Sequence, residues 1–181
     1  NTAVSKLINN INEYETIKKH LPQNAKTILD IGSGVAGIDV LISKHYKNKI
    51  SIFLIDKTQV DDKIYYKFNK KGAFYNSLNV SKMILNINGV PLNKIYLQEA
   101  TKKNEINFRK KFDIVISLIS WGFHYPVSTY LDKVYTNLNK NGTLILDIRK
   151  NTHGMEEIKR KFGNYKIINE TKTITRILAT K

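Results

Sequence analysis

Three glycines follow a short apolar run in a pattern that suits a nucleotide. The run Thr27–Ile31 leads directly into Gly32-Ser33-Gly34-Val35-Ala36-Gly37, and a helical pattern comes next. Glycines at such a strand-to-helix turn allow a tight bend and let a ligand lie against bare backbone. Alone, this motif indicates no particular nucleotide, because glycine-rich turns of this kind are common.

Two carboxylates near this turn restrict the kinds of ligand that it can bind. Asp30 lies two residues before Gly32, where it would repel a pyrophosphate and attract an ammonium group. Asp56 ends a second apolar run, 19 residues after Gly37, where a carboxylate can accept two hydrogen bonds from a ribose diol. The alternatives are structural: Asp30 as a cap of nearby amides, and Asp56 as a turn residue at a strand end. The 181 residues also leave no room for the second half of a dehydrogenase.

Strand and helix patterns alternate along the chain and must position these residues. Buried strands are predicted at 27–31, 50–55, 94–97, 113–118 and 143–148. Helices are predicted at 3–21, 38–46, 77–88, 127–138 and 153–162. Two last strands, 165–169 and 173–179, are too close together for a helical crossover, so they pair as a hairpin or lie apart.

This order predicts an α/β fold with a doubly wound, Rossmann-like sheet of seven strands, mostly parallel with a C-terminal antiparallel hairpin. We expect a single domain over 1–181, with an N-terminal helix within 1–22 and a lid over 57–76. The aromatic residues of 57–76 either cover an acceptor or pack the loop.

The glycine turn and its two carboxylates resemble the class I S-adenosylmethionine-dependent methyltransferases. The stretch 28–37 is similar to the family's first motif, Asp56 to its second-strand acid, and the closing hairpin to its reversed seventh strand. The resemblance implies S-adenosylmethionine as cofactor, with Glu99 and Ala100 against the adenine; an ordinary exposed role is the alternative for Glu99. Many members carry glycine where this chain has Ala36, and we expect Gly37 to compensate by shifting the turn one residue. The expected cofactor-binding residues are Asp30, Gly32, Ser33, Gly34, Gly37, Asp56, Lys57, Glu99, Ala100 and Ser117.

The segment after the fourth strand is the expected place of methyl transfer, because ligands of open α/β sheets lie beyond the carboxyl ends of the strands. The segment 117–126 reads SLISWGFHYP and is rich in aromatic residues. His124 is the candidate catalytic base, since imidazole takes up a proton near neutral pH, and an orienting or structural role is its alternative. We expect Trp121, Tyr125 and Arg149 to contact the acceptor.

This segment lacks the signatures of nucleic-acid methylation. Enzymes that methylate base amino groups carry an Asp/Asn-Pro-Pro-Tyr/Phe tetrapeptide here, and only Tyr125-Pro126 is similar to it. Ribose methyltransferases related to the heat-shock rRNA enzyme place an aspartate in this loop, but no acidic residue occurs between Leu118 and Tyr130. The stretch 121–126 looks more like enzymes that methylate sugars or other small hydroxyl compounds. No metal site is predicted.

The charge of the chain is strongly positive, with 30 Lys and Arg against 15 Asp and Glu and a formal net charge of +15. Such a balance is typical of nucleic-acid binding. However, the lysines are scattered, and a surplus of Lys, Asn and Ile is also what an AT-rich genome encodes. The arginines, whose planar fork suits phosphate and guanine, are only Arg109, Arg149, Arg160 and Arg176.

The resulting expectation is a cytoplasmic S-adenosylmethionine-dependent methyltransferase for a hydroxyl of a small molecule or sugar. No apolar run approaches the ~20 residues of a membrane helix, and the absence of cysteine excludes disulfides and thiolate chemistry. An RNA methyltransferase whose lysines grip phosphates is one alternative. A non-catalytic, cofactor-binding module of a larger assembly is another, since the chain begins at Asn1 instead of methionine.

Overall fold

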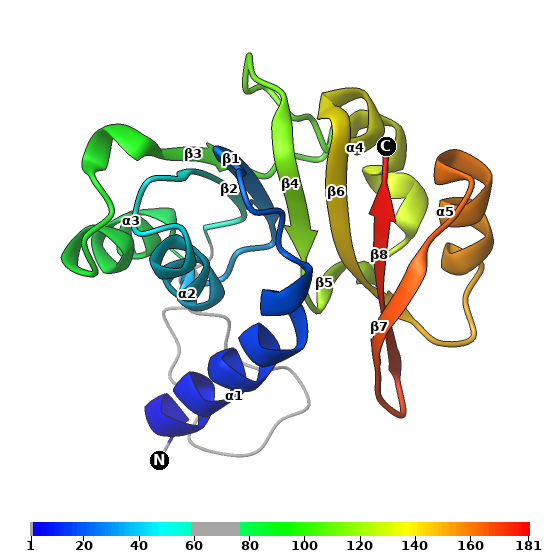
Figure 1. The fold of residues 1–181 in the computed structure, drawn as a ribbon, viewed down its shortest axis with the longest axis horizontal. Helices are drawn as coiled ribbons and strands as arrows, with labels where there is room; N and C mark the ends of the chain where they lie inside the picture. Colours follow the sequence, from blue (N-terminus) through cyan, green and yellow to red (C-terminus); the bar gives the residue numbers. More distant parts are fainter. Residues whose placement is uncertain (1, 59–76) are drawn as a thin grey trace.

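A twisted sheet with helices on both faces organises the chain (Figure 1). The computed structural model describes residues 2–58 and 77–181, so most of the predicted lid lies outside the described residues. The helices are α1 (Thr2–Ile17), α2 (Gly37–His45), α3 (Leu78–Ile87), α4 (Leu131–Asn137) and α5 (Gly154–Phe162). Short 3-10 turns are η1 (Lys18–His20), η2 (Leu92–Lys94) and η3 (Val127–Thr129). The strands are β1 (Thr27–Ile31), β2 (Ser51–Asp56), β3 (Ile95–Glu99), β4 (Phe112–Ser117), β5 (Ser120–Tyr125), β6 (Leu138–Arg149), β7 (Lys166–Glu170) and β8 (Ile174–Thr180).

Seven of these strands form one sheet in the order β3-β2-β1-β4-β6-β8-β7. The pairs β1–β2, β2–β3, β1–β4 and β4–β6 are parallel, whereas β8 is antiparallel to both β6 and β7. The predicted mostly parallel sheet with an antiparallel C-terminal hairpin is therefore confirmed. The chain leaves β1 towards β2 on one side and later returns to β4 on the other. Such a switch of direction opens a crevice at the carboxyl ends of the two strands.

Each face of the sheet is buried under its own helices, as a parallel sheet requires. On one face, Ile28 and Ile52 belong to a core cluster with Ile17 of α1, Ile42 of α2 and Leu85 of α3. On the other face, the core combines strand residues with helical residues of α4 and α5: Leu29, Phe53, Leu144, Val134 and Ile158. Residues of β1 alternate between these two clusters, so the side-chain direction of any β1 residue follows from its parity.

The segment after β4 is a strand, not the predicted loop. After the turn at Leu118 and Ile119, β5 runs back against β6 at the lower edge of the sheet in Figure 1. The predicted helix over 127–138 is divided into η3 and the shorter α4. It ends at Asn137 because Leu138 already pairs with Phe112 at the start of β6.

A buried arginine joins α1 to the C-terminal half of the sheet. Arg176 on β8 is 2% exposed. Its guanidinium donates from Nε to Oδ1 of Asp147 (2.7 Å) and from Nη2 to Oδ2 (2.8 Å). Its Nη1 donates to Thr16 Oγ1 (2.6 Å), and it also forms an ion pair with Glu13, so two residues of α1 are bound. A buried charge is tolerated only when it is paired in this way.

Arg176→Ala would leave the fully buried Asp147 without its counter-charge. We expect the variant to lose about 3–5 kcal/mol of unfolding free energy, measured by urea denaturation. The control is Lys150→Ala, which breaks a partly exposed pair with Glu170 (3.1 Å) and should cost at most about 1 kcal/mol. Equal losses in the two variants would contradict this account.

Candidate functional site

The glycine turn between β1 and α2 is fixed by hydrogen bonds from neighbouring elements. The amide of Gly32 donates to the Ile55 carbonyl at the end of β2 (2.7 Å). The amide of Gly34 donates to Oδ2 of Asp56 (2.6 Å), and Ser81 Oγ on α3 donates to the Gly34 carbonyl (2.9 Å). Both glycines have positive φ values, +83° and +59°, which other residues adopt only with strain.

Ala36, and not Gly37, supplies the left-handed residue just before α2. Ala36 has φ +59°, and its amide donates to the Ser33 carbonyl (2.9 Å), whereas Gly37 is the first residue of α2. The expected shift of the turn to Gly37 is therefore wrong. A Cβ at position 37 would lie 2.0 Å from Nδ2 of Asn10, so any other residue there would displace the end of the Asn10 side chain. Helix α1 thus packs directly against the turn.

The start of β5 also packs against the turn. A Cβ on Gly32 would lie 1.9 Å from Oγ and 2.2 Å from Cβ of Ser120, so the Ser120 side chain occupies the space that any other residue at 32 would need. The preceding Ile119 has φ +54°, a costly conformation for a β-branched residue. Its amide donates to Oδ2 of the buried Asp147 (3.2 Å). The predicted cofactor turn and acceptor segment are consequently neighbours.

Two acidic residues lie side by side where β2 and β3 end. Asp56 and Glu99 are register partners in the parallel pair. Oδ1 of Asp56 accepts from the amide of Lys57 (2.6 Å), while Glu99 accepts from the amide (2.5 Å) and Oγ1 (2.9 Å) of Thr58. The amide of Ala100 donates to the Asp56 carbonyl (2.8 Å). A carboxylate has about four acceptor positions, so Glu99, which accepts from Thr58 twice, can also accept from a ligand.

Two predicted site residues, Ser117 and Trp121, are instead part of the interior. The Ser117 hydroxyl donates to the Ile31 carbonyl (2.6 Å) and accepts from the amide of Trp121 (3.0 Å). Trp121 is fully buried, and its indole N–H donates to the Val127 carbonyl (2.8 Å). Since every polar group of the two side chains is satisfied internally and neither is exposed, both hold the end of β4 and offer no surface to a ligand. This corrects the expected contact of Ser117 with a cofactor and of Trp121 with an acceptor.

The other predicted acceptor residues surround Phe123 on β5 and β6. His124 is exposed and contacts the ring of Phe123 edge-on, with 5.0 Å between ring centroids. The guanidinium of Arg149 lies 5.4 Å from the centroid of the same ring. Tyr125 is 60% exposed. Burial, then Tyr125, then Asp56 raise the pKa of Tyr130, so this tyrosine lies within electrostatic reach of both the acceptor segment and the cofactor edge.

A pair of buried carboxyl groups adjoins the turn. Asp30 has the same parity as Ile28, so it points from β1 towards α2, where Asp39 lies in the first helical turn. Asp30 is 3% exposed and Asp39 is fully buried. Burial raises the pKa of Asp39 to about 7. Burial, then Asp39 and then Asp56 raise the pKa of Asp30 well above its usual range.

Sequence reasoning missed Asp39. The buried face of α2 includes Ile38, Asp39, Ile42 and Ser43. The available signal was the i, i+4 spacing of Asp39 and Ser43 beside the equally spaced Ile38 and Ile42. An acid on the buried face of a helix needs an explanation because it is rarely buried without a partner.

Buried polar atoms without partners test whether a cofactor fits here. Within the described residues, neither carboxylate oxygen of Asp39 nor the hydroxyl of Ser33, which is 8% exposed, has a hydrogen-bond partner. Each such atom costs about 1–3 kcal/mol when left unsatisfied. An ammonium group and hydroxyl groups, which S-adenosylmethionine carries, match this need for donors. The residues present therefore fit this cofactor.

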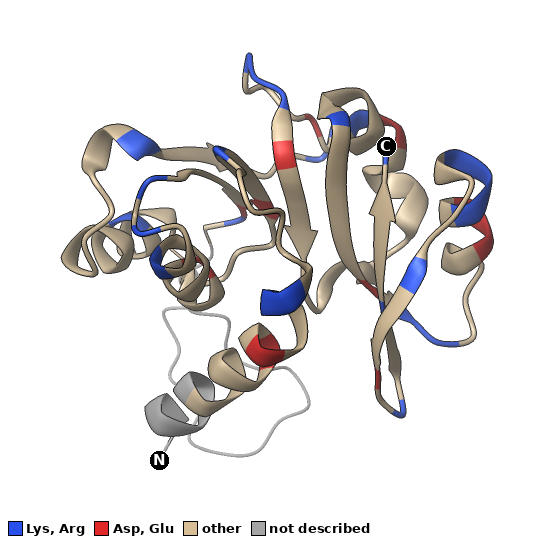
Figure 2. Cartoon of the chain, viewed as in Figure 1, with Lys and Arg blue, Asp and Glu red and all other residues tan. Residues whose placement is uncertain are grey.

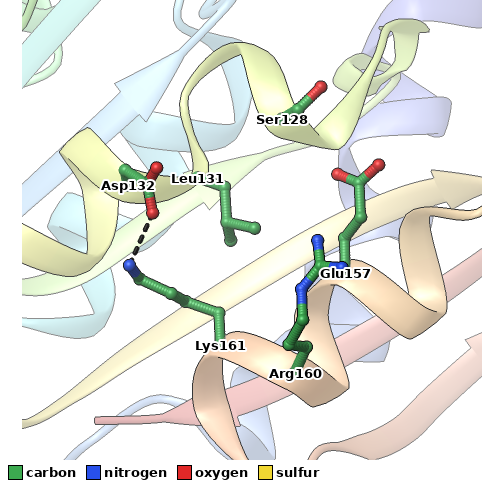
Figure 3. Close-up of a pocket in the computed structure, with 6 residues that line it drawn as sticks. All are labelled: Ser128, Leu131, Asp132, Glu157, Arg160 and Lys161. Carbon is green, nitrogen blue, oxygen red and sulfur yellow. Dashed lines mark hydrogen bonds and ion pairs between the residues drawn. The ribbon is translucent and has the colours of Figure 1, made fainter.

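One hollow lies away from the predicted site residues, and the described part of the chain has neither a metal-binding cluster nor a membrane-spanning helix. A hollow of about 380 Å³ is lined by residues of η3, α4 and α5: Ser128, Leu131, Asp132, Glu157, Arg160 and Lys161 (Figure 3). Lys161 reaches across it to Asp132 (2.5 Å), and no predicted site residue lines it. Over residues 2–58 and 77–181, no three His, Asp or Glu residues are placed to bind a metal, and no helix is long and apolar enough to cross a membrane.

Comparison with solved structures identifies the fold. A T. thermophilus 16S rRNA methyltransferase in complex with AdoMet and guanosine matches 95% of the chain at TM-score 0.67 and 11% identity. A Nostoc punctiforme protein assigned as an O-methyltransferase matches 94% at 0.64 and 16%. A precorrin-6y C5,15-methyltransferase from Geobacter metallireducens matches 92% at 0.62 and 16%. The chain has the class I methyltransferase fold.

The resemblance that the sequence carries is thus confirmed at the level of the fold. No protein-family model matches the sequence, and no curated protein does. The chain spans 42% of the T. thermophilus enzyme and 56% of the Nostoc protein, about half their length, but 85% of the Geobacter enzyme. The names of these proteins give different methyl acceptors, so the shared fold does not determine which acceptor this chain would use.

Asp39→Asn should stabilise the protein at high pH. In the unfolded chain the carboxyl ionises near its ordinary pKa of 3.8, whereas the folded protein retains the proton until about pH 7. Stability therefore falls as pH rises from about 4 to about 7, and the amide escapes this loss. We expect a gain of about 2 kcal/mol at pH 8, roughly 4–8 °C in Tm, and none at pH 4.

The control is Asp132→Asn, since the Asp132 side chain is 84% exposed. It should show no gain at pH 8. A pH-independent effect of Asp39→Asn on Tm would contradict the buried pair.

Proposed function

We propose that the chain is an S-adenosylmethionine-dependent methyltransferase that acts on a hydroxyl group of a small molecule or sugar. One observation carries this proposal: Asp30 and Asp56 lie towards the carboxyl ends of adjacent parallel strands, on either side of a glycine turn packed under α1 and β5. The methyltransferase fold supports it. A crevice at the carboxyl ends of such strands is where ligands of this class of sheet bind.

Different residues of the described chain are positioned to bind different parts of the cofactor. Asp30 is positioned for the ammonium group, Asp56 for the ribose diol, and the edge at Glu99 and Ala100 for the adenine. The bound cofactor would supply an already activated methyl group. The protein's main task is then to hold the acceptor in line, which accounts for much of catalysis in such reactions.

His124 is proposed as the group that takes the proton of the acceptor hydroxyl. It is exposed on β5, the strand whose first residue packs against the glycine turn. The ring of Phe123 contacts both His124 and Arg149, so these three side chains form one acceptor surface with Tyr125 beside it. Arg149 is suited to an anionic group on the acceptor.

The surface charge supports a small acceptor over RNA. Figure 2 shows the Lys and Arg residues of the described chain spread over many elements, among them the segment leading into β4, the turn after α1, β7 and α5. Nucleic-acid binding draws on a continuous stripe or patch of such charge. RNA methylation is the function that one compared enzyme carries, and it stays the alternative.

Asp56→Asn should weaken the binding of S-adenosylmethionine by about 10–100-fold, because hydrogen bonds to a charged group are worth about 1.5–3 kcal/mol. Isothermal titration calorimetry measures this change. Asp132→Asn is again the control, with unchanged affinity. Absence of binding to the unchanged protein would refute both the methyltransferase and a cofactor-binding module.

His124→Ala should lower kcat by about 10²–10⁴-fold without changing cofactor affinity, since that is the contribution of a general base. A radiolabelled methyl-transfer screen across small hydroxyl compounds, RNA, DNA and protein first identifies the acceptor. His153→Ala is the matched control, because the side chain of His153 is 94% exposed on another element. Full activity of His124→Ala would contradict the role of His124 as the base. Methylation of RNA that falls steeply with salt would show that the acceptor is RNA and not a small molecule.

A further inference from the structure

We propose that Asp39 is a second carboxylate of the ammonium subsite, and that Asp30 and Asp39 exchange a shared proton for the cofactor's ammonium group. This inference rests on the proposed function and adds a residue and a proton to it. Asp39 lies outside the glycine turn and outside every residue that the sequence motif implies.

The geometry of the pair carries the inference. Asp39 is fully buried, and neither of its carboxylate oxygens has a hydrogen-bond partner among the described residues. It is near enough to Asp30 for the two side chains to form a hydrogen bond once one of them holds a proton. Two ionised carboxylates have no hydrogen to share, so the two side chains can hydrogen-bond to each other only while at least one of them holds a proton.

A second unsatisfied group points to a ligand at the same place. The hydroxyl of Ser33, in the middle of the glycine turn, is also buried without a partner. In the sequence, Ser33 lies four residues before Gly37, the first residue of α2, and Asp39 two residues after it. Buried polar atoms left unsatisfied so close together in the chain are expected where a polar ligand completes the structure.

The surroundings of the pair are short of positive charge. Asp56 acts on Asp30 from β2 and adds a third acid. The elements packed against α2 contribute uncharged groups near the turn, Asn10 from α1 and Ser81 from α3. Lys44 and His45 lie in the last turn of α2 and are exposed. Among the side chains described, those of 8–58 and 77–181, no Lys, Arg or His forms an ion pair with Asp30 or Asp39, so a bound cation would balance the site.

The exchange balances in protons and charge. Above about pH 7, where Asp39 is ionised and Asp30 still holds its proton, the free pair carries one proton and a charge of −1. When an ammonium group of charge +1 binds, the O–H bond of the protonated carboxyl breaks and its proton passes to the solvent. The pair then carries −2 against +1, and no covalent bond forms. Affinity should therefore rise with pH, by up to tenfold per pH unit, until the pair is ionised in the free protein.

An ammonium group fits this pair better than a divalent metal ion. Calcium takes 6–8 oxygen ligands, and magnesium takes six in near-octahedral geometry. The pair provides only two carboxyl groups, and the described residues form no cluster of three or more metal-binding side chains. A single monocation with hydrogen-bond donors matches two closely placed acceptors.

Calorimetry of S-adenosylhomocysteine binding tests the exchange, because this probe keeps the ammonium, ribose and adenine. Titrations at pH 6, 7 and 8 in two buffers of different ionisation enthalpy count the protons released. The unchanged protein should release about one proton at pH 8 and more at pH 6, and gain about tenfold or more in affinity between pH 6 and pH 8. Asp39→Asn should release fewer protons than the unchanged protein, bind with a shallower pH profile because only Asp30 still titrates, and be about tenfold weaker at pH 8.

Ser43→Ala is the matched control, one helical turn further along the buried face of α2. Ser43 bonds only the Val40 carbonyl (2.9 Å), so this variant should keep the proton release and the pH profile. Thermal denaturation verifies that each variant is folded.

The outcomes separate the two proposals. Binding by the unchanged protein without proton release, or an equal pH slope in Asp39→Asn, would overturn the exchange and leave the cofactor proposal standing. Absence of binding at every pH would overturn the proposed function itself. A rise in Tm with Mg²⁺ alone that Asp39→Asn abolishes would assign the pair to a metal ion and also overturn the inference.

Discussion

The buried ion pair between Arg176 and Asp147 is the interaction on which the rest of the site depends. Asp147 uses the same carboxylate to bind Arg176 and to hold the amide of Ile119 at the strained turn after β4. Arg176 in turn binds Glu13 and Thr16 on α1. One buried pair therefore fixes both segments that cover the glycine turn, β5 from one side and α1 from another.

This dependence sets the limit of what the sequence predicts. The glycine turn, Asp56 and six of the seven sheet strands follow from local patterns, because a buried parallel strand is a continuous apolar run with a marked end. Only part of β6 was anticipated, since its start at Leu138 is fixed by pairing with Phe112 and not by its own residues. The pairing of Asp147 with Arg176 joins residues 29 positions apart through an antiparallel register, and no local pattern specifies it.

The roles of the aromatic segment could not be separated for a similar reason. Trp121, Phe123 and Tyr125 alternate, which is the pattern of a strand, yet a loop with a histidine and several aromatic residues is also the pattern of a binding site. These three residues share one face of β5, and the structure resolves the ambiguity by their position along the strand. Trp121 turns into the core, where its N–H finds the Val127 carbonyl, and Tyr125 lies largely exposed at the far end of β5. Ala36 was misjudged because steric cost alone favours glycine at positive φ, whereas Gly37 begins α2 and packs against Asn10.

The two kinds of charge in this protein act on different scales. The excess of lysines lies mostly in water, where salt screens charges beyond about 10 Å. Asp30 and Asp39 are few but buried, and their interaction is screened far less. Because Asp30 and Asp39 are buried, the free protein becomes less stable once the pH exceeds the range in which these carboxyl groups are protonated. A cation that binds only the folded state offsets this loss of stability, because its binding shifts the folding equilibrium towards the folded protein. A buried acid pair beside a glycine turn is therefore costly as a structural element but useful as a binding element, and this difference favours ligand recognition as its role.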